Sequence, residues 1–271
     1  MAFTDTWSIR PRPTEGATIV GQGFRITVLT ARLFRLEYEI ENRFREGATK
    51  TVIDRAFPLP AFTVNERGGR LSIETEAVRL EYDKKPFSAE GLTAVMKNTL
   101  LNHGSVWHYG ESERNLKGTA RTLDRADGAV VKGMGRGEED CPLPMDDGVM
   151  SLDGFAVLDD SHSMGMDETG RLTPADGLGV DIYLFAYGHD FKAALRDFYR
   201  LCGPVPAVPR YALGNWWSRY YSYTEKTYKA LMERFAAERV PLSVAVIDMN
   251  WHVTDIDPKY GSGWTGYTWN P

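Results

Sequence analysis

One carboxylate stands out because of the residues that precede it. Asp248 directly follows the apolar run Val244–Ile247, in the segment VAVIDMNWH. Four consecutive apolar residues are typical of a strand buried on both faces, as in a parallel sheet. Ligands of such sheets bind at the carboxyl ends of the strands. Asp248 therefore either faces a ligand cleft or caps the turn that follows, and the residue types alone leave both interpretations open.

A second group of polar residues follows an earlier strand, and a helix separates it from the strand that ends at Asp248. Ser218, Arg219 and Tyr220 follow residues 212–217, which we expect to form a short strand. Residues 227–238 then carry apolar side chains at helical spacing, with Thr224 as the expected N-cap. Strand, helix and strand make a βαβ unit, so the two polar groups are predicted to meet at one edge of a parallel sheet.

The next residues could suggest a metal site. His252, Asp255 and Asp257 lie close together, but their spacing is irregular for metal ligands. We therefore favour a solvated loop. The triplet Asp159-Asp160-Ser161 also resembles a catalytic cluster, yet it follows an apolar run and is typical of a turn with an Asx cap.

The elements ahead of this region have a different period. Apolar and polar residues alternate in four segments, and Gly-rich or polar turns separate them. The segments are residues 23–41, with a bend at 30–32, then 62–65, 70–75 and 77–82. Period two with short turns predicts an antiparallel β-sandwich. Residues 102–150, rich in Gly, Asp and Arg, are expected to form long loops.

Helical spacing first appears after His189. Asp190 is the expected N-cap of a helix over residues 191–201, which Gly203 and Pro204 terminate. The proline-rich segment GPVPAVPRY then reads as a linker. We therefore predict an amino-terminal domain over residues 1–205 and a second domain over residues 206–271.

Composition limits the classes of partner. The chain has 271 residues, a net charge of -5 and a pI of about 5.6, which disfavours nucleic acids and anionic membranes as ligands. The N-terminus shows no signal peptide and no apolar run approaches a membrane span, so we expect a cytoplasmic protein. Cys141 and Cys202 form no C-x-x-C pair, which argues against a metal knuckle or redox motif.

Several segments together resemble glycoside hydrolase family 31, the retaining α-glucosidases and α-xylosidases. PRYALGNWWSRYYSYTEKTY, VPLSVAVIDMNWH and GWTGYTWNP are similar to the start of the catalytic barrel, whereas NLKGTARTLD and LDGFAVLDDS resemble the amino-terminal sandwich. The resemblance extends over roughly residues 23–271. It implies a mainly β chain, in which a galactose-mutarotase-like β-sandwich is followed by the truncated β-α-β start of a (β/α)₈ TIM barrel.

The resemblance also implies where the chemistry lies. A retaining mechanism uses two carboxylates about 5 Å apart, one as nucleophile and one as acid/base. In the family both lie on later barrel strands, while a barrel needs about 250 residues. The nucleophile motif of the family has a Trp before its aspartate and a Glu after it. DMNWH has neither. We therefore expect no catalytic residue within this chain, and expect the chain on its own to be inactive.

By the same resemblance, three residues bind substrate. Asp248 takes the place of the aspartate that binds hydroxyls of the sugar in the minus-one subsite, and Met249 that of an apolar neighbour. Tyr220, or in the adjacent register Tyr221, matches an aromatic residue at the end of the first strand. The substrate would be an oligosaccharide or α-glycoside, with no metal and no cofactor; the sugar and the linkage stay open. An incomplete barrel could also associate with other chains.

A sandwich loop supplies an aspartate to the active site in many members of the family. The candidates in this region are Asp124, Asp127, Asp140, Asp146 and Asp147, and no motif selects one of them.

Two other functions fit parts of the sequence. One is a stand-alone carbohydrate-binding or interaction sandwich, although an isolated βαβ tail would expose apolar faces and strand edges. The other is a mutarotase-like epimerase, which needs His and Glu general acid/base groups on the sandwich. His108 and Glu111 are available for that role.

Overall fold

The chain divides into two compact units, Met1–Pro204 and Val205–Pro271. The computed structural model describes residues 8–97, 106–111, 114–118, 131–133, 141–143, 146–174, 179–205, 208–249, 251–261, 263 and 267–270. The assignment of residues 1–205 and 206–271 to separate domains stays a prediction. No helix within these described ranges is long and apolar enough to cross a membrane.

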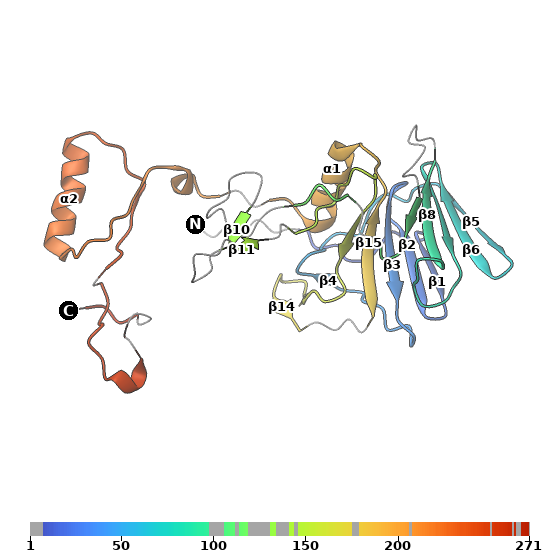
Figure 1. The fold of residues 1–271 in the computed structure, drawn as a ribbon, viewed down its shortest axis with the longest axis horizontal. Helices are drawn as coiled ribbons and strands as arrows, with labels where there is room; N and C mark the ends of the chain where they lie inside the picture. Colours follow the sequence, from blue (N-terminus) through green and yellow to red (C-terminus); the bar gives the residue numbers. More distant parts are fainter. Residues whose placement is uncertain are drawn as a thin grey trace. The chain divides into compact units, whose positions relative to one another are not determined.

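The first unit contains two five-stranded antiparallel sheets (Figure 1). The first sheet has the order β1-β2-β3-β15-β12, with bounds Thr18–Gly21, Phe24–Val28, Leu33–Tyr38, Val180–Phe185 and Ala156–Asp159. The second has the order β5-β6-β7-β8-β9, with bounds Phe62–Arg67, Arg70–Thr75, Val78–Tyr82, Leu92–Met96 and Val106–His108. The expected turn between β5 and β6 forms at Gly68 and Gly69, both at positive φ, which glycine adopts without steric cost.

Short strands complete this unit. β4 (Ala48–Thr49), β13 (Gly165–Met166) and β14 (Leu172–Thr173) form a small sheet of three strands. β10 (Val131–Gly133) and β11 (Cys141–Leu143) pair as a two-stranded ribbon within the region expected to form loops.

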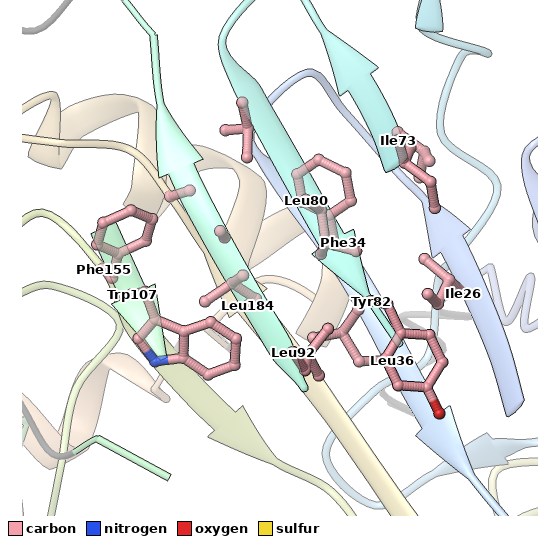
Figure 2. Close-up of a cluster of buried hydrophobic side chains, with 14 of the residues drawn as sticks. Ile26, Phe34, Leu36, Ile73, Leu80, Tyr82, Leu92, Trp107, Phe155 and Leu184 are labelled. Atoms are coloured by element: carbon pink, nitrogen blue, oxygen red, sulfur yellow. The ribbon is translucent and has the colours of Figure 1, made fainter. Parts of the chain in front are cut away.

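The two large sheets share one hydrophobic core. Ile26, Phe34, Leu36 and Leu184 of the first sheet pack with side chains of the second, and Figure 2 shows these residues. The partners from the second sheet and its connections include Ile73, Leu80, Tyr82, Leu92 and Trp107, all buried. Period-two patterning therefore predicted the sandwich correctly, and the mainly β fold is confirmed.

The opposite face of the first sheet is buried as well. Helix α1 (Phe191–Cys202) lies along it, and Ala193, Ala194 and Leu201 pack against Tyr183 and Phe185 of β15 (Figure 1). The N-cap is Asp190, as predicted, and its side chain accepts a hydrogen bond from the amide of Ala193 at 3.1 Å. The alternating pattern had indicated a single buried face, and this interpretation is wrong for β2, where every residue is buried.

Paired charges make this second buried face possible. Arg35 of β3 donates to both carboxylate oxygens of Asp181 on β15, at 2.8 and 2.7 Å. Arg25 of β2 donates in the same way to Glu37, at 2.6 and 2.8 Å. Each of these four charges thus has an oppositely charged partner, which offsets the cost of removing it from water.

The second unit has the predicted βαβ order in a shorter form. β16 (Trp216–Trp217) pairs in parallel with β17 (Val244–Ala245), and α2 (Glu225–Ala237) connects them. Thr224 is the N-cap of α2, as expected, and forms a reciprocal capping box with Thr227. The 3₁₀ helices η1 (Arg210–Leu213) and η2 (Pro258–Tyr260) complete the unit.

Two details of this unit differ from the sequence prediction. Residues 212 and 213, expected to begin the first strand, belong to η1 instead. The run Val244–Ile247 is not covered on both faces, because Ala245 and Ile247 are exposed. One connecting helix covers only one side of a two-stranded sheet, so the other side of this run has no cover within the described residues.

Candidate functional site

The edge of the β16–β17 pair brings together the polar groups singled out in the sequence. Trp217 pairs with Ala245 at the carboxyl ends of the two strands. The amide of Val246 extends this ladder by donating to the carbonyl of Trp217 at 2.9 Å. Tyr220 lies three residues after Trp217, and Asp248 lies three residues after Ala245. Both therefore leave the same edge at equivalent distances along the chain.

These side chains differ in exposure. Tyr220 is 80% exposed and Asp248 is also exposed, whereas Met249 is half-buried. An exposed carboxylate and an exposed phenol are acceptor and donor groups that a ligand can reach. The roles proposed for the three residues, however, stay predictions.

The neighbouring aromatic residues are engaged in contacts within the unit. The Arg219 guanidinium lies 4.6 Å from the ring centre of Tyr221, and the Tyr221 ring centre lies 4.6 Å from that of Tyr223. Tyr223 in turn packs edge-on against Tyr228 of α2 at 5.1 Å. These contacts link Tyr221 to α2 through Tyr223.

The same chain of contacts fixes the end of β17. The Tyr228 hydroxyl donates to the carbonyl of Val246 at 2.6 Å, two residues before Asp248. Trp217 packs edge-on against Phe235 of α2 at 5.0 Å, whereas Trp216 is 51% exposed. The two tryptophans therefore point to opposite sides of the strand, as period two requires, and at least Trp217 is structural.

A cluster of rings after Asp248 was missed in the sequence. Trp251 packs against Tyr267 at 5.8 Å and against Trp269 at 5.4 Å. Backbone pairing holds this cluster together, since the amide of Val253 donates to the Thr268 carbonyl and that of Asn270 to the Trp251 carbonyl, both at 2.9 Å. The signal available in the sequence was the aromatic segment Tyr267-Thr268-Trp269, which also belongs to the family motif GWTGYTWNP.

The other candidates have structural surroundings. His252 is buried, and the described residues contain no group of three or more His, Cys, Asp or Glu side chains that could hold a metal ion. The triplet forms the expected turn, in which the amide of Ser161 donates to Asp159 Oδ1 at 2.9 Å. Asp160 is fully buried and accepts from the Thr49 hydroxyl at 2.9 and 3.0 Å.

Of the five candidate loop aspartates, the structure describes Asp146 and Asp147. Asp124, Asp127 and Asp140 lie outside the described residues. Asp147 forms an ion pair with Lys117 at the surface, and Asp146 is exposed beside it. No feature of these two selects one as a ligand-binding residue.

The acid/base pair considered for an epimerase is in contact but not free. The backbone amide of His108 donates to the Glu111 carboxylate at 3.0 Å. The ring nitrogen Nδ1 of His108 lies 2.9 Å from the carbonyl of Ala89. The Glu111 carboxylate thus stabilises the turn after β9, and the His108 ring contacts the segment before β8.

Comparison with known proteins now bears on this site. Residues 205–271 match the family described as "Glycosyl hydrolases family 31 TIM-barrel domain". An α-xylosidase of Saccharolobus solfataricus is 27% identical over 128 residues, which cover 45% of this chain and 16% of the relative. α-Glucosidase 2 of Bacillus thermoamyloliquefaciens is 34% identical over 77 residues, which cover 28% of this chain and 10% of the relative. The matched segments thus span a small part of both relatives.

Solved structures extend the similarity to most of the chain. A family 31 dextranase of Flavobacterium johnsoniae, in complex with isomaltotriose, superposes with a TM-score of 0.51 at 18% identity. The match covers 88% of this chain and 32% of the dextranase. A complex of the same dextranase with glucose gives a TM-score of 0.50 at 16% identity. At such identities the similarity concerns the fold, and it agrees with a sandwich followed by the start of a TIM barrel. The resemblance to family 31 drawn from the sequence motifs is confirmed.

Proposed function

We propose that this chain, a portion of a glycoside hydrolase family 31 protein, supplies substrate-binding residues to a retaining α-glycosidase that removes terminal α-glucosyl or α-xylosyl residues. The observation that carries the proposal is the register of the β16–β17 pair. It sets Asp248 and Tyr220 at the same edge of a parallel sheet, within the segment that matches the barrel domain. In such barrels this edge holds the ligand.

Asp248 is suited to hold a sugar ring in place. A carboxylate accepts hydrogen bonds from two adjacent hydroxyl groups, and such charge-assisted bonds are stronger than neutral ones. In a retaining enzyme these bonds tighten as the ring flattens toward the oxocarbenium-like transition state. Asp248 therefore contributes to rate as well as to binding.

The neighbours of Asp248 have complementary roles. Met249 is half-buried and offers an apolar surface to the C–H groups of the sugar. The Tyr220 ring, which is 80% exposed, is free to pack on a second face of the substrate. The substrate is an oligosaccharide or α-glycoside, and nucleic acids and membranes are not expected partners. The cytoplasm is the proposed location.

Bond cleavage requires groups other than these. A retaining glycosidase needs a nucleophile and an acid/base about 5 Å apart, on opposite sides of the scissile bond. We assign neither role to residues 206–271. In this proposal, residues 206–271 bind the sugar, and carboxylates on later barrel strands cleave the glycosidic bond.

The test is an Asp248→Asn substitution in the protein that carries the whole barrel. The amide keeps the shape of the side chain but loses its charge. The expected loss of transition-state stabilisation is about 2 to 4 kcal/mol, which lowers kcat/KM by about thirtyfold to a thousandfold. The measurement uses aryl α-glycosides with and without the 4- and 6-hydroxyls. The loss should be largest for the intact sugar and smallest for the deoxy analogues.

Asp255→Asn is the matched control. Asp255 is an exposed carboxylate in the following loop, and its substitution should change kcat/KM by less than about twofold. Equal losses on all substrates for Asp248→Asn would indicate a scaffold role. An inactive Asp248→Ala variant that azide reactivates, with a glycosyl azide of inverted configuration as product, would identify Asp248 as the nucleophile and refute the proposal.

A further inference from the structure

We propose that the first unit carries a second saccharide-binding site, in a groove at one end of the β-sandwich. The groove has a volume of about 540 Å³, and its lining includes Tyr38, Ile40, Tyr109, Asp159 and His162. We call it the sandwich groove. Ligand pockets for small molecules have volumes of about 300 to 1,000 Å³, so this space is large enough for a short oligosaccharide.

Both sheets of the sandwich contribute to the groove. Tyr38 is the last residue of β3 and Asp159 the last residue of β12, both in the first sheet. Tyr109 follows β9 of the second sheet directly, and its amide donates to the Leu92 carbonyl at 3.0 Å. The groove therefore lies where the ends of the two sheets meet, and strands on both sides fix the position of its walls.

Two aromatic residues, Tyr38 and Tyr109, line the groove. The Phe87 ring lies between Tyr38, at 5.6 Å, and Tyr109, at 5.4 Å. Phe87 also packs edge-on against the buried ring of Tyr82 at 5.3 Å. Each ring is thus fixed by its neighbour, and a fixed ring binds the C–H face of a sugar at little cost in side-chain entropy.

The groove also contains a carboxylate, that of Asp159, and a phenol, that of Tyr109, which can form hydrogen bonds with a ligand. Asp159 Oδ1 accepts from the Ser161 amide at 2.9 Å, which fixes the direction of the carboxylate. Burial raises the pKa of Tyr109, and the nearby charge of Asp159 raises it further, so the phenol stays protonated at neutral pH. Together they offer a hydroxyl donor and a carboxylate acceptor to one ligand.

The charge of the lining indicates the class of ligand. Asp159 contributes a carboxylate, whereas the Glu39 carboxylate accepts hydrogen bonds from the amides of Glu41 and Arg43. No arginine or lysine lies among the described residues that line the groove. A phosphate or other anion would be repelled, whereas a neutral polyhydroxyl ligand can use the rings and the carboxylates together. The choice of an α-glucosidic oligosaccharide within this class rests on the function proposed above.

Titration calorimetry on the 271-residue chain tests the proposal, with maltotriose and isomaltotriose as probes. Tyr109→Ala should weaken binding of at least one of them by about fivefold or more, the effect of losing about 1 kcal/mol of ring contact. Asp159→Asn should weaken it by a similar factor. Tyr109→Phe keeps the ring and loses only the phenol donor, so it should weaken binding less than Tyr109→Ala, which separates the ring contact from the hydrogen bond.

Two controls separate this site from the barrel edge. Tyr199→Ala removes an exposed ring of α1 outside the groove and should leave the affinity of the groove unchanged, whereas Asp248→Asn should reduce only saccharide binding at the barrel edge. If Asp248→Asn abolishes binding while Tyr109→Ala does not, the saccharide binds at the barrel edge, and the groove proposal fails while the proposed function stands. Absence of binding by the unmodified chain overturns the groove proposal as well, and leaves the proposed function to its own kinetic test.

Discussion

The two units bury their side chains to very different extents. All buried hydrophobic side chains among the described residues belong to the first unit, between Ala17 and Leu201. In the second unit, Trp216 of β16 and Ile247, which follows β17, are about half exposed. The second unit nevertheless carries the clearest family motifs. The hydrophobic core thus lies in the first unit, whereas the clearest family motifs lie in the second. A segment can therefore carry family motifs without a complete core of its own.

The two helices show the same contrast. α1 buries Ala193, Ala194 and Leu201 against the first sheet. No residue of α2 is buried, and the helix is held by its capping box at Thr224 and by the Tyr228 hydroxyl. Packing of an apolar face supplies most of the stability of a helix in a protein. We therefore expect the first unit to contribute most of the free energy of unfolding of this chain.

The largest effect on stability should come from the buried charges of the first sheet. Arg35→Met leaves Asp181 buried without its bidentate partner, which destabilises a protein by about 3 to 5 kcal/mol. Arg43→Met is the control, because the Arg43 side chain is 58% exposed and its shorter ion pair, with Glu41, lies at the surface. Urea unfolding of both variants measures the difference. A loss for Arg35→Met no larger than that for Arg43→Met would show that the pairing is not needed.

The same pair predicts a dependence on pH. Burial alone would raise the pKa of Asp181, but the charge and hydrogen bonds of Arg35 outweigh burial and lower it below its ordinary value. A carboxyl group with a lowered pKa stabilises the fold above its unfolded pKa, and this stability is lost as the pH falls through the folded pKa. Unfolding free energy should therefore decrease below about pH 4, and less steeply in Asp181→Asn.

A smaller effect separates the two units directly. Leu80 is fully buried in the sandwich core, and Leu80→Ala should cost about 2 to 5 kcal/mol. Leu231 of α2 is half-buried, and the same substitution there should cost about 1 kcal/mol or less. Thermal or urea unfolding, followed for both variants, gives the comparison. Equal costs would mean that the second unit has a core of its own.

Local signals in the sequence were sufficient for the elements. Asp190 and Thr224 cap the helices as predicted, since an N-cap depends on a side chain and amides two or three residues away. The alternation in residues 23–41 likewise predicted β2 and β3. The pattern could not show that both faces of β2 are buried. The buried charges Arg25 of β2 and Arg35 of β3 have their partners on other strands, and Asp181, the partner of Arg35, lies far along the chain.

Sites were harder to predict than elements. The βαβ order predicted that residues after Trp217 and Ala245 share an edge, since that follows from parallel pairing alone. The sandwich groove could not be predicted, because Tyr38, Tyr109 and Asp159 come from strands whose neighbours are set by tertiary packing. The triplet that contains Asp159 was interpreted correctly as a turn, yet its carboxylate also lines the groove.

The most direct test of the central claim, that this chain binds sugar but does not cleave it, is an assay of the purified 271-residue chain with aryl α-glucosides and α-xylosides. We predict no release of the aryl group above the rate without protein, since losing the catalytic carboxylates costs many orders of magnitude in rate. The assay should be repeated after further purification and at several concentrations of the chain. Turnover that survives purification and rises in proportion to the concentration of the chain would contradict the account.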